Sequence, residues 1–229
     1  MSQMEDTTVT CPRCGASWST QLFTSVDADT IEVQVAAIIA GNFERHSCGR
    51  CGAAFRPEHG LLFVSHARGL WIVMLPPAER PRFATLENGV AQVILGNIAR
   101  AAPVLAERLA GVRPRLVFGQ HMLSEAVRVA YAGVGAELLE CAKLLTVRRN
   151  LLALIQHGPF ELCFERFEAG APVCAVHAIP TGERVAELAL ADDVLAETEA
   201  SQPEMQALFP ELFARPYVSA TRYLLADTV

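Results

Sequence analysis

Two short stretches, Cys11-Pro12-Arg13-Cys14-Gly15 and Cys48-Gly49-Arg50-Cys51-Gly52, decide how the first part of this chain folds. Each places two thiols three positions apart and follows them with a glycine. Two thiolates at this spacing can bind one metal ion from a tight turn, and the glycine lets the backbone turn back without a Cβ clash. The two turns supply four sulfur ligands and leave no coordination position open, which is typical of a structural site. The sequence therefore predicts one structural zinc ion per chain, held by Cys11, Cys14, Cys48 and Cys51.

Three alternatives bear on these cysteines. A redox pair normally begins a helix that follows a strand. Cys11 and Cys14 are instead followed by Gly15, and a second pair with the same spacing occurs at Cys48 and Cys51. An iron ion could bind to the same four thiolates, and the sequence does not distinguish zinc from iron. His46 could replace a thiolate, but a histidine there is more often solvated or adjacent to the ligands. The other three thiols (Cys141, Cys163, Cys174) lie in helical or strand patterns, and we expect them in the core.

The composition favours a soluble protein of the cytoplasm. Of the 229 residues, 52% are hydrophobic, enough for a packed interior without disulfides. The seven cysteines and the polar, acidic residues 1–6 favour a reducing compartment over secretion. No apolar run reaches the roughly 18 residues that a membrane span needs. The net charge of −6 disfavours a large surface for binding nucleic acid.

Residues 7–77 are predicted to be rich in strands. A strand from Trp18 to Val26 follows the first cysteine pair, and a short helix from Asp29 or Thr30 to Ala40 ends at Gly41. An inserted strand and helix would account for the 33 residues between the two cysteine pairs. The apolar runs 61–65 and 70–75 flank a turn at Gly69, which predicts a hairpin. We therefore expect a zinc ribbon over 7–60 and a hairpin over 61–77.

Residues 87–157 are predicted to be helical. The first helix has apolar residues at a 3.6-residue period, and we expect Pro103 to interrupt it. A second helix begins near Gln120 or Met122, and a third covers 135–156. In the third helix Leu152 is expected on the apolar side, and Glu140 and Lys143 on the polar side. The periodic residues of the first helix are Val90, Val93, Ile94 and Ile98, with Ala101 and Leu105 as an extension.

Residues 158–229 are predicted to return to strands. Polar and apolar residues alternate over 160–165, and turns are expected at 168–171 and 181–183. Ser201 is predicted to begin a helix that Pro210 splits into two pieces, and a last strand is expected over 217–225. The class is α+β, with domains 1–157 and 158–229 packed on one core. The helix that begins at Ser201 carries an apolar stripe, and we expect this stripe to pack in the core rather than to dock into a partner's groove. The stripe consists of Met205, Leu208, Phe209, Leu212 and Phe213.

Several of these motifs together resemble the CpXC domain, a bacterial and archaeal family named for two Cys-Pro-x-Cys motifs. They are the two cysteine pairs, the 61–75 hairpin ending in Pro76, the stretch 118–125 and the stretch 140–143. The resemblance covers roughly residues 7–150. The second pair departs from the family because Gly49 replaces proline, although both ligands remain. The family has no established activity that could be transferred to this chain. The resemblance implies a domain that a metal ion holds together, in a bacterial cytoplasm.

The function expected from these features is that of a non-enzymatic zinc protein, an adaptor or regulatory subunit, with no catalytic residues. We expect an unidentified protein partner and leave a homo-oligomer open. One alternative is an enzyme that uses His121 and Glu125, which at i and i+4 could form an acid–base pair, but no nucleophile or oxyanion signature accompanies them. The other alternative is a protein that binds nucleic acid through the arginines around the ribbon. The acidic net charge of the chain argues against this alternative. The arginines are Arg13, Arg45, Arg50 and Arg56.

Overall fold

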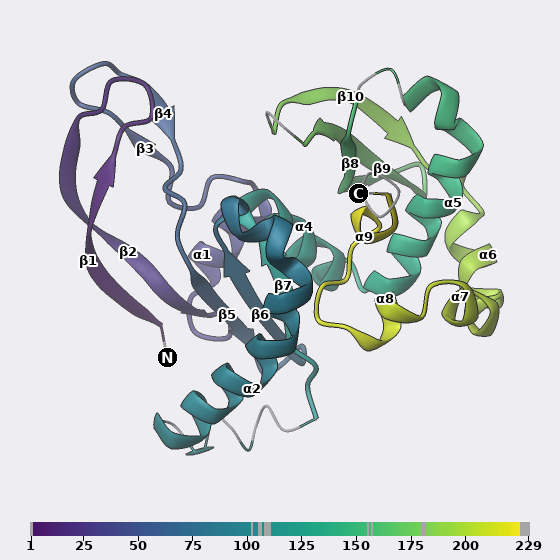
Figure 1. Cartoon of the computed structure of the whole chain (residues 1–229), viewed down its shortest axis with the longest axis horizontal. Helices are drawn as coiled ribbons and strands as arrows, with labels where there is room; N and C mark the ends of the chain where they lie inside the picture. The colour runs from purple at the N-terminus through teal and green to yellow at the C-terminus, as the bar shows by residue number, and fades with distance from the viewer. Residues whose placement is uncertain are drawn as a thin grey trace. The chain divides into compact units, whose positions relative to one another are not determined.

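A computed structural model describes residues 2–101, 103–104, 107, 111–154, 156, 158–179 and 182–224 of the chain. The chain divides into two compact units, Met1–Val127 and Arg128–Val229 (Figure 1). It has N-terminal strands beside a cysteine cluster, helices in the middle and a C-terminal sheet, which confirms the predicted α+β class. Among the described helices, none combines the length and the apolar character needed to cross a membrane.

The first unit is built on a five-stranded sheet in the order β1-β2-β5-β6-β7. β1 pairs with β2 and β5 with β6 in antiparallel fashion, whereas β2–β5 and β6–β7 are parallel pairs. Phe63, Trp71 and Ile72 from the central strands are almost completely buried and form the middle of this core. The strands are β1 (Gln3–Thr10), β2 (Ser17–Asp27), β5 (Leu61–Ser65), β6 (Leu70–Leu75) and β7 (Arg115–Phe118).

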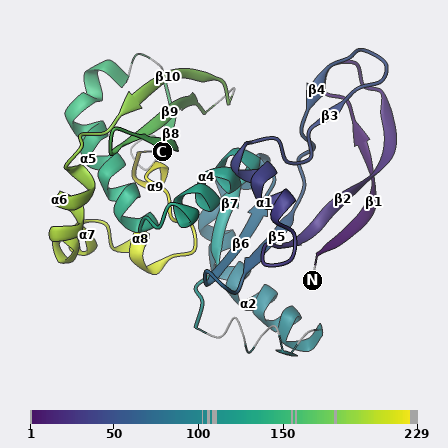
Figure 2. The same ribbon diagram turned by 180° about the vertical axis from the view of Figure 1, so that it is seen from behind.

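Local sequence signals explain most of this unit. The predicted strand over 18–26 is part of β2, and the predicted hairpin is β5–β6, with Gly69 at φ +59° in its turn. The predicted helix is α1 (Glu32–Ile39), which ends before Gly41 at φ +69° and lies against the sheet in Figure 2. Asp29 does not cap this helix; its carboxylate accepts hydrogen bonds from the β5–β6 turn instead, from the Ser65 hydroxyl and the N–H groups of His66 and Ala67.

The middle of the chain is helical with one exception. After the 3₁₀ helix η1 (Pro77–Arg82) come α2 (Phe83–Ala101) and α4 (Gly119–Tyr131), as expected. The region predicted to be helical, 87–157, also contains the strand β7, which was not predicted and whose four residues pair with β6. Such a short strand forms because a neighbouring strand satisfies its backbone, so its own sequence carries little signal. Four of the periodic side chains of the first helix (Val93, Ile94, Ile98, Ala101), together with Leu105 and with Ala102, which precedes Pro103, lie outside the described part.

The second unit packs the helix α5 (Ala136–Leu154) against a three-stranded antiparallel sheet in the order β10-β9-β8. Apolar residues of α5, among them Leu139 and Ala142, share a buried cluster with Phe164 and Val176 of the sheet. The turn expected over 168–171 is confirmed, with Gly170 at φ +93°. The strands are β8 (Phe160–Glu168), β9 (Ala171–Ala178) and β10 (Arg184–Ala189). α5 precedes residue 157 in the sequence and yet packs in the second unit. The domain boundary expected at residue 157 stays a prediction.

The predicted faces of α5 are wrong at three residues. Leu152 is 90% exposed, whereas Glu140 and Lys143 are 6% and 1% exposed. The Lys143 ammonium donates to Glu140 Oε1 at 2.5 Å, and Glu140 Oε2 accepts the Ala220 N–H at 2.6 Å. The buried charges are therefore paired and hydrogen-bonded, which is the condition under which a protein interior accepts them.

The chain beyond β10 is helical, with α6 (Val194–Ala200) first. The helix expected after Ser201 is confirmed, and so is its division at Pro210 into α7 (Gln202–Leu208) and α8 (Pro210–Ala214). The stripe on these helices packs mainly inward, because Met205, Phe209 and Leu212 are buried while Leu208 is 56% exposed. The strand predicted over 217–225 is wrong, since α9 (Thr221–Leu224) forms there, and Leu225 lies outside the described residues.

Candidate metal centre

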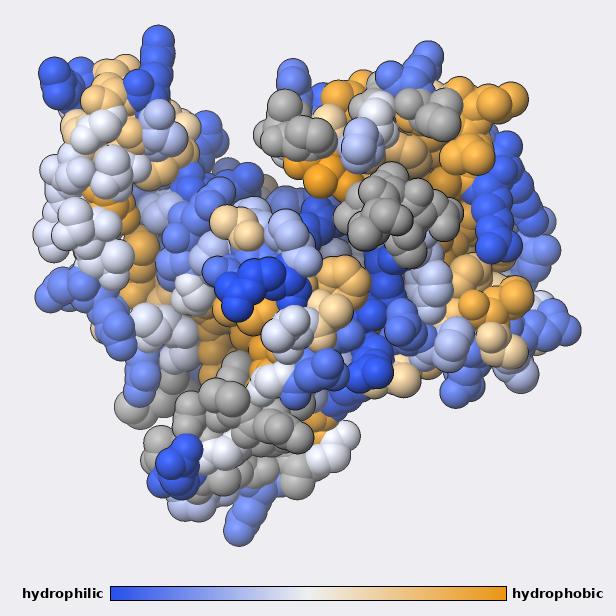
Figure 3. Space-filling view, viewed as in Figure 1, coloured by the Kyte–Doolittle hydropathy of each residue, from blue (hydrophilic) through white to orange (hydrophobic). Residues whose placement is uncertain are grey.

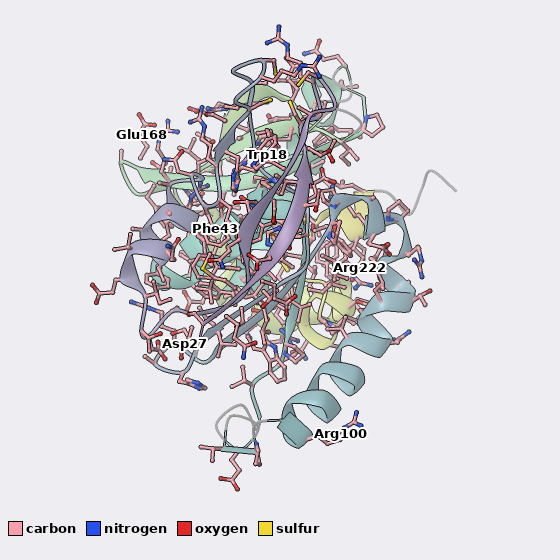
Figure 4. The ribbon with its side chains drawn as sticks, turned by 90° about the vertical axis from the view of Figure 1, so that its left-hand side faces the viewer. Trp18, Asp27, Phe43, Arg100, Glu168 and Arg222 are labelled. Atoms are coloured by element: carbon pink, nitrogen blue, oxygen red, sulfur yellow. The ribbon has the colours of Figure 1, made fainter. Side chains whose placement is uncertain are left out.

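Two hairpins of the first unit carry the cysteine pairs. Residues 11–15 lie in the turn between β1 and β2, and residues 48–52 lie in the turn between the short strands β3 (His46–Ser47) and β4 (Ala54–Phe55). We call these two turns the knuckles, and residues 10–18 and 45–57 together the ribbon tip. Figure 4 shows sulfur atoms gathered at this tip, beyond the labelled Trp18. The Trp18 and Phe55 rings meet edge to face below the knuckles, with their centroids 5.8 Å apart.

The knuckles have the same backbone conformation. In each, the N–H of the first cysteine donates to the carbonyl five residues later, and the glycine N–H donates back to the carbonyl of that cysteine. Gly15 and Gly52 have φ angles of +69° and +70°, a region that residues with a Cβ rarely adopt. The four bonds are Cys11 to Ala16 (2.8 Å), Gly15 to Cys11 (3.0 Å), Cys48 to Ala53 (2.9 Å) and Gly52 to Cys48 (2.8 Å). The missing proline of the second knuckle therefore leaves its turn unchanged.

The four sulfur atoms converge on one point. Cys11 Sγ lies 3.7 Å from Cys51 Sγ, and Cys14 Sγ lies 3.6 Å from Cys48 Sγ. All four lie within 4.8 Å of one another, and none of these cysteines is in a disulfide. Four sulfurs arranged tetrahedrally at about 2.3 Å from a zinc ion are about 3.8 Å apart. The donor atoms thus fit a metal ion bound by four thiolates.

Backbone N–H groups favour ionisation of one thiol in particular. Hydrogen bonds from the N–H groups of Cys51 and Arg50 lower the pKa of Cys48 to about 6. The Ala16 N–H acts in the same direction on Cys14, but burial and the neighbouring thiols prevail and raise the pKa of Cys14 to about 12. Four adjacent thiols cannot all ionise alone, because each new thiolate repels the others. A bound cation removes that obstacle.

The ribbon tip is rich in arginine and contains no Asp or Glu within residues 10–18 and 45–57. Its four arginines are exposed, and polar residues gather at this end of the unit in Figure 3. A divalent cation with four thiolates has a net charge of −2, so nearby guanidinium groups offset it. The arginines are Arg13, Arg45, Arg50 and Arg56. His46 is not one of the clustered ligands; its ring lies 6.4 Å from that of Phe55.

A buried carboxylate at the base of the ribbon was not foreseen from the sequence. Glu44 has φ +48°, its Oε1 accepts the Phe23 N–H at 2.6 Å, and its Oε2 lies 3.1 Å from His59 Nε2. Burial raises the pKa of Glu44, although the Phe23 N–H and the His59 ring oppose this. These contacts join β2 to the segment that follows β4. No sequence signal reveals them, because the three residues lie far apart along the chain.

The possible acid–base pair and the other three cysteines lie away from the cysteine cluster in the sequence. His121 is half-buried and Glu125 is 8% exposed, both on α4, and a catalytic role for them stays a hypothesis. The remaining cysteines are buried within the second unit, in keeping with the expected core role: Cys141, Cys163 and Cys174.

Comparisons with known proteins yield one match. A family model described as CpXC protein matches residues 9–143, more than half of the chain. The matched range contains both knuckles and the hairpin β5–β6. No curated protein and no solved structure matches the chain.

Proposed function

The chain belongs to the CpXC family, and from this premise we propose that it is a structural-zinc protein without catalytic activity that acts through contacts with another protein. The observation that carries the proposal is the convergence of four cysteine sulfurs at the end of two hairpins. A site with four protein ligands leaves no position for a substrate or a reactive water, so its ion has a structural role.

Zinc is the ion that the donor set favours. Thiolates are soft ligands, and a tetrahedral set of four sulfurs is typical of zinc or of iron–sulfur chemistry. The two knuckles share the cysteine spacing typical of closed zinc sites, and each is followed by a positive-φ glycine. Elemental analysis of the purified chain should find one zinc per chain. A stoichiometric amount of iron in its place would refute the choice of metal.

The edge of the first sheet supports a role in protein binding. β1 pairs only with β2 among the described strands, and each of its side chains except Val9 is exposed. An edge strand presents backbone N–H and C=O groups to which an extended peptide can add as another strand. A groove of about 410 Å³ lies along β1 and is bounded on its far side by residues 55–59. We therefore assign an extended segment of a partner protein as the occupant of this edge.

The partner proposal is tested in two steps. A photo-crosslinking residue at Thr8 would identify the bound protein, and the affinity of that protein in purified form is then measured. Replacing Thr7 and Thr8 together with lysine should weaken binding at least tenfold, because lysine on an edge strand opposes strand addition. Gln206→Lys, on the exposed surface of α7, is the matched control and should change nothing. A partner whose affinity is the same for both variants would refute the assignment.

A further inference from the structure

A cavity separate from the metal centre lies within the first unit. Its volume is about 130 Å³. Residues 56–59, which connect β4 to β5, form one side, the first residues of α4 form another, and Met74 and Pro77 contribute apolar surface. A protein cavity of roughly 150 Å³ holds benzene, so this one has room for a molecule of about six non-hydrogen atoms.

The side chain of Gln120 lines this cavity with unused hydrogen-bonding groups. Gln120 is 9% exposed, and both its Nε2 and its Oε1 are buried without a hydrogen-bond partner. Buried side-chain amides in proteins are nearly always satisfied. The two atoms are adjacent, one a donor and the other an acceptor. A ligand that satisfies both must present an acceptor beside a donor.

The start of α4 adds backbone donors to the same cavity. α4 has 13 residues, and the first N–H groups of a helix have no acceptor within it. Neither Phe118 nor Gly119 has a side chain that could cap them. Gly119 has φ +79°, and a Cβ there would lie 2.8 Å from Pro77 Cγ, so glycine allows this helix end to approach the cavity wall. The partial positive charge at a helix N-terminus favours an anionic group.

Charges of both signs occur on the opposite side. Arg56 and Glu58 line the cavity from the same short segment. One N–H of Arg56 donates to the Gly41 carbonyl at 3.0 Å, and a guanidinium has further donors. His59 holds the segment in place, because its Nε2 lies 3.0 Å from the Phe23 carbonyl and 3.1 Å from Glu44 Oε2. An anion alone would be opposed by Glu58, whereas a zwitterion is suited to both charges.

We infer that this cavity binds a free α-amino acid with a small side chain, such as alanine. The carboxylate of the ligand lies at the N-terminus of α4 and accepts a hydrogen bond from Gln120 Nε2. The ammonium donates to Gln120 Oε1 and faces the carboxylate of Glu58. Met74 and Pro77 adjoin the small side chain and limit its size. The inference uses neither the sulfur cluster nor the β1 edge, but residues 56–59 line both this cavity and the groove beside β1.

The test is calorimetric titration of the purified full-length chain with L-alanine, and separately with sodium acetate and sodium phosphate. We expect saturable binding of L-alanine and binding at least tenfold weaker for the two anions, which lack an ammonium. Gln120→Leu should weaken L-alanine binding at least tenfold, and the matched control Gln206→Leu, on an exposed face, should not. Phosphate or acetate bound as tightly as L-alanine would overturn the inference, as would the lack of saturable L-alanine binding.

Thermal unfolding without ligand gives a second readout. If the Gln120 amide is unpaired in the free protein, Gln120→Leu should leave the melting temperature unchanged or raise it. A lowered melting temperature together with unchanged L-alanine affinity would mean that the amide is structural, and the inference would fail. If the leucine variant does not fold, Gln120→Glu keeps the size and places a negative charge beside the ligand carboxylate. That variant should also weaken binding at least tenfold.

Discussion

Replacing Cys48 with serine should release the metal ion and open the ribbon tip while the five-stranded sheet stays folded. Cys48 is 2% exposed and supplies one of the four converging sulfurs. A serine hydroxyl is a poor substitute for a thiolate, because it does not ionise near neutral pH and is a harder ligand than sulfur. The variant thus removes one ligand with little change in side-chain size.

The structure indicates how much of the tip depends on the metal. Cys14 and Cys48 are 34 positions apart, and closing such a loop costs about 3 kcal/mol in chain entropy. The protein contacts opposing that cost are few. β3 and β4 pair over two residues each, and the edge-to-face contact of Trp18 with Phe55 contributes about 1 kcal/mol. Structural zinc in small zinc-finger peptides contributes roughly 10–16 kcal/mol, so a zinc ion bound here would decide whether the tip is ordered.

Two measurements test this prediction. Elemental analysis should show that Cys48→Ser has lost most of its zinc, and hydrogen exchange should show that the ribbon tip exchanges much faster while β5 and β6 remain protected. Cys141→Ala is the matched control, because Cys141 is equally buried but lies in the second unit. Stoichiometric zinc in Cys48→Ser with unchanged exchange would refute the reasoning. A metal-free wild-type chain with a Cys11–Cys14 disulfide would refute it equally.

Three further predictions concern other parts of the chain. Glu140→Gln removes the carboxylate that pairs with the buried Lys143 ammonium and should destabilise the protein by about 3–5 kcal/mol in urea unfolding, whereas a loss below about 1 kcal/mol would contradict the role of the pair. The hydrogen bonds that Asp29 accepts hold the pKa of this carboxyl below its usual 3.8 despite partial burial. The charged form therefore stabilises the fold above that value, and Asp29→Asn should be less stable than wild type at pH 7. This difference should shrink as the pH falls below 3.8, and a difference that does not depend on pH would exclude the linkage. Finally, fluorescence anisotropy with mixed DNA and RNA at physiological salt should show no strong binding, given the net charge of −6. Sub-micromolar binding that weakens with salt and with Arg50→Ala would reverse this conclusion.

Features set by neighbouring residues could be predicted from the sequence. The bounds of β5 and β6 agree with the two apolar runs because Gly69 provides the positive φ that their turn requires. The clustering of the four cysteines could be predicted for the same reason, since the two thiols of each knuckle come from one turn. Pro210 likewise divides α7 from α8, because a proline in a helix interior loses a hydrogen bond and clashes with the preceding turn.

Features set by distant contacts could not be predicted. Residues 217–225 have the aromatic and β-branched composition of a strand, yet Glu140, 80 positions earlier, accepts the Ala220 N–H and the chain turns into α9. β7 exists because β6 pairs with it. The cavity beside α4 could not be predicted either, because whether the Gln120 amide has hydrogen-bond partners depends on the residues that surround it in space. Periodicity in one segment contains no information of this kind.

The two hairpins of the ribbon tip connect to the rest of the first unit in different ways. β2 continues from the first knuckle into the sheet, where Ser25–Asp27 pair with β5, so this hairpin is an extension of the main sheet. The second hairpin has only two residue pairs and is followed by residues 56–59, which His59 fixes through Phe23 and Glu44. A metal ion bound by the four cysteines would therefore join a strand that the sheet already orders to a hairpin too short to be stable alone.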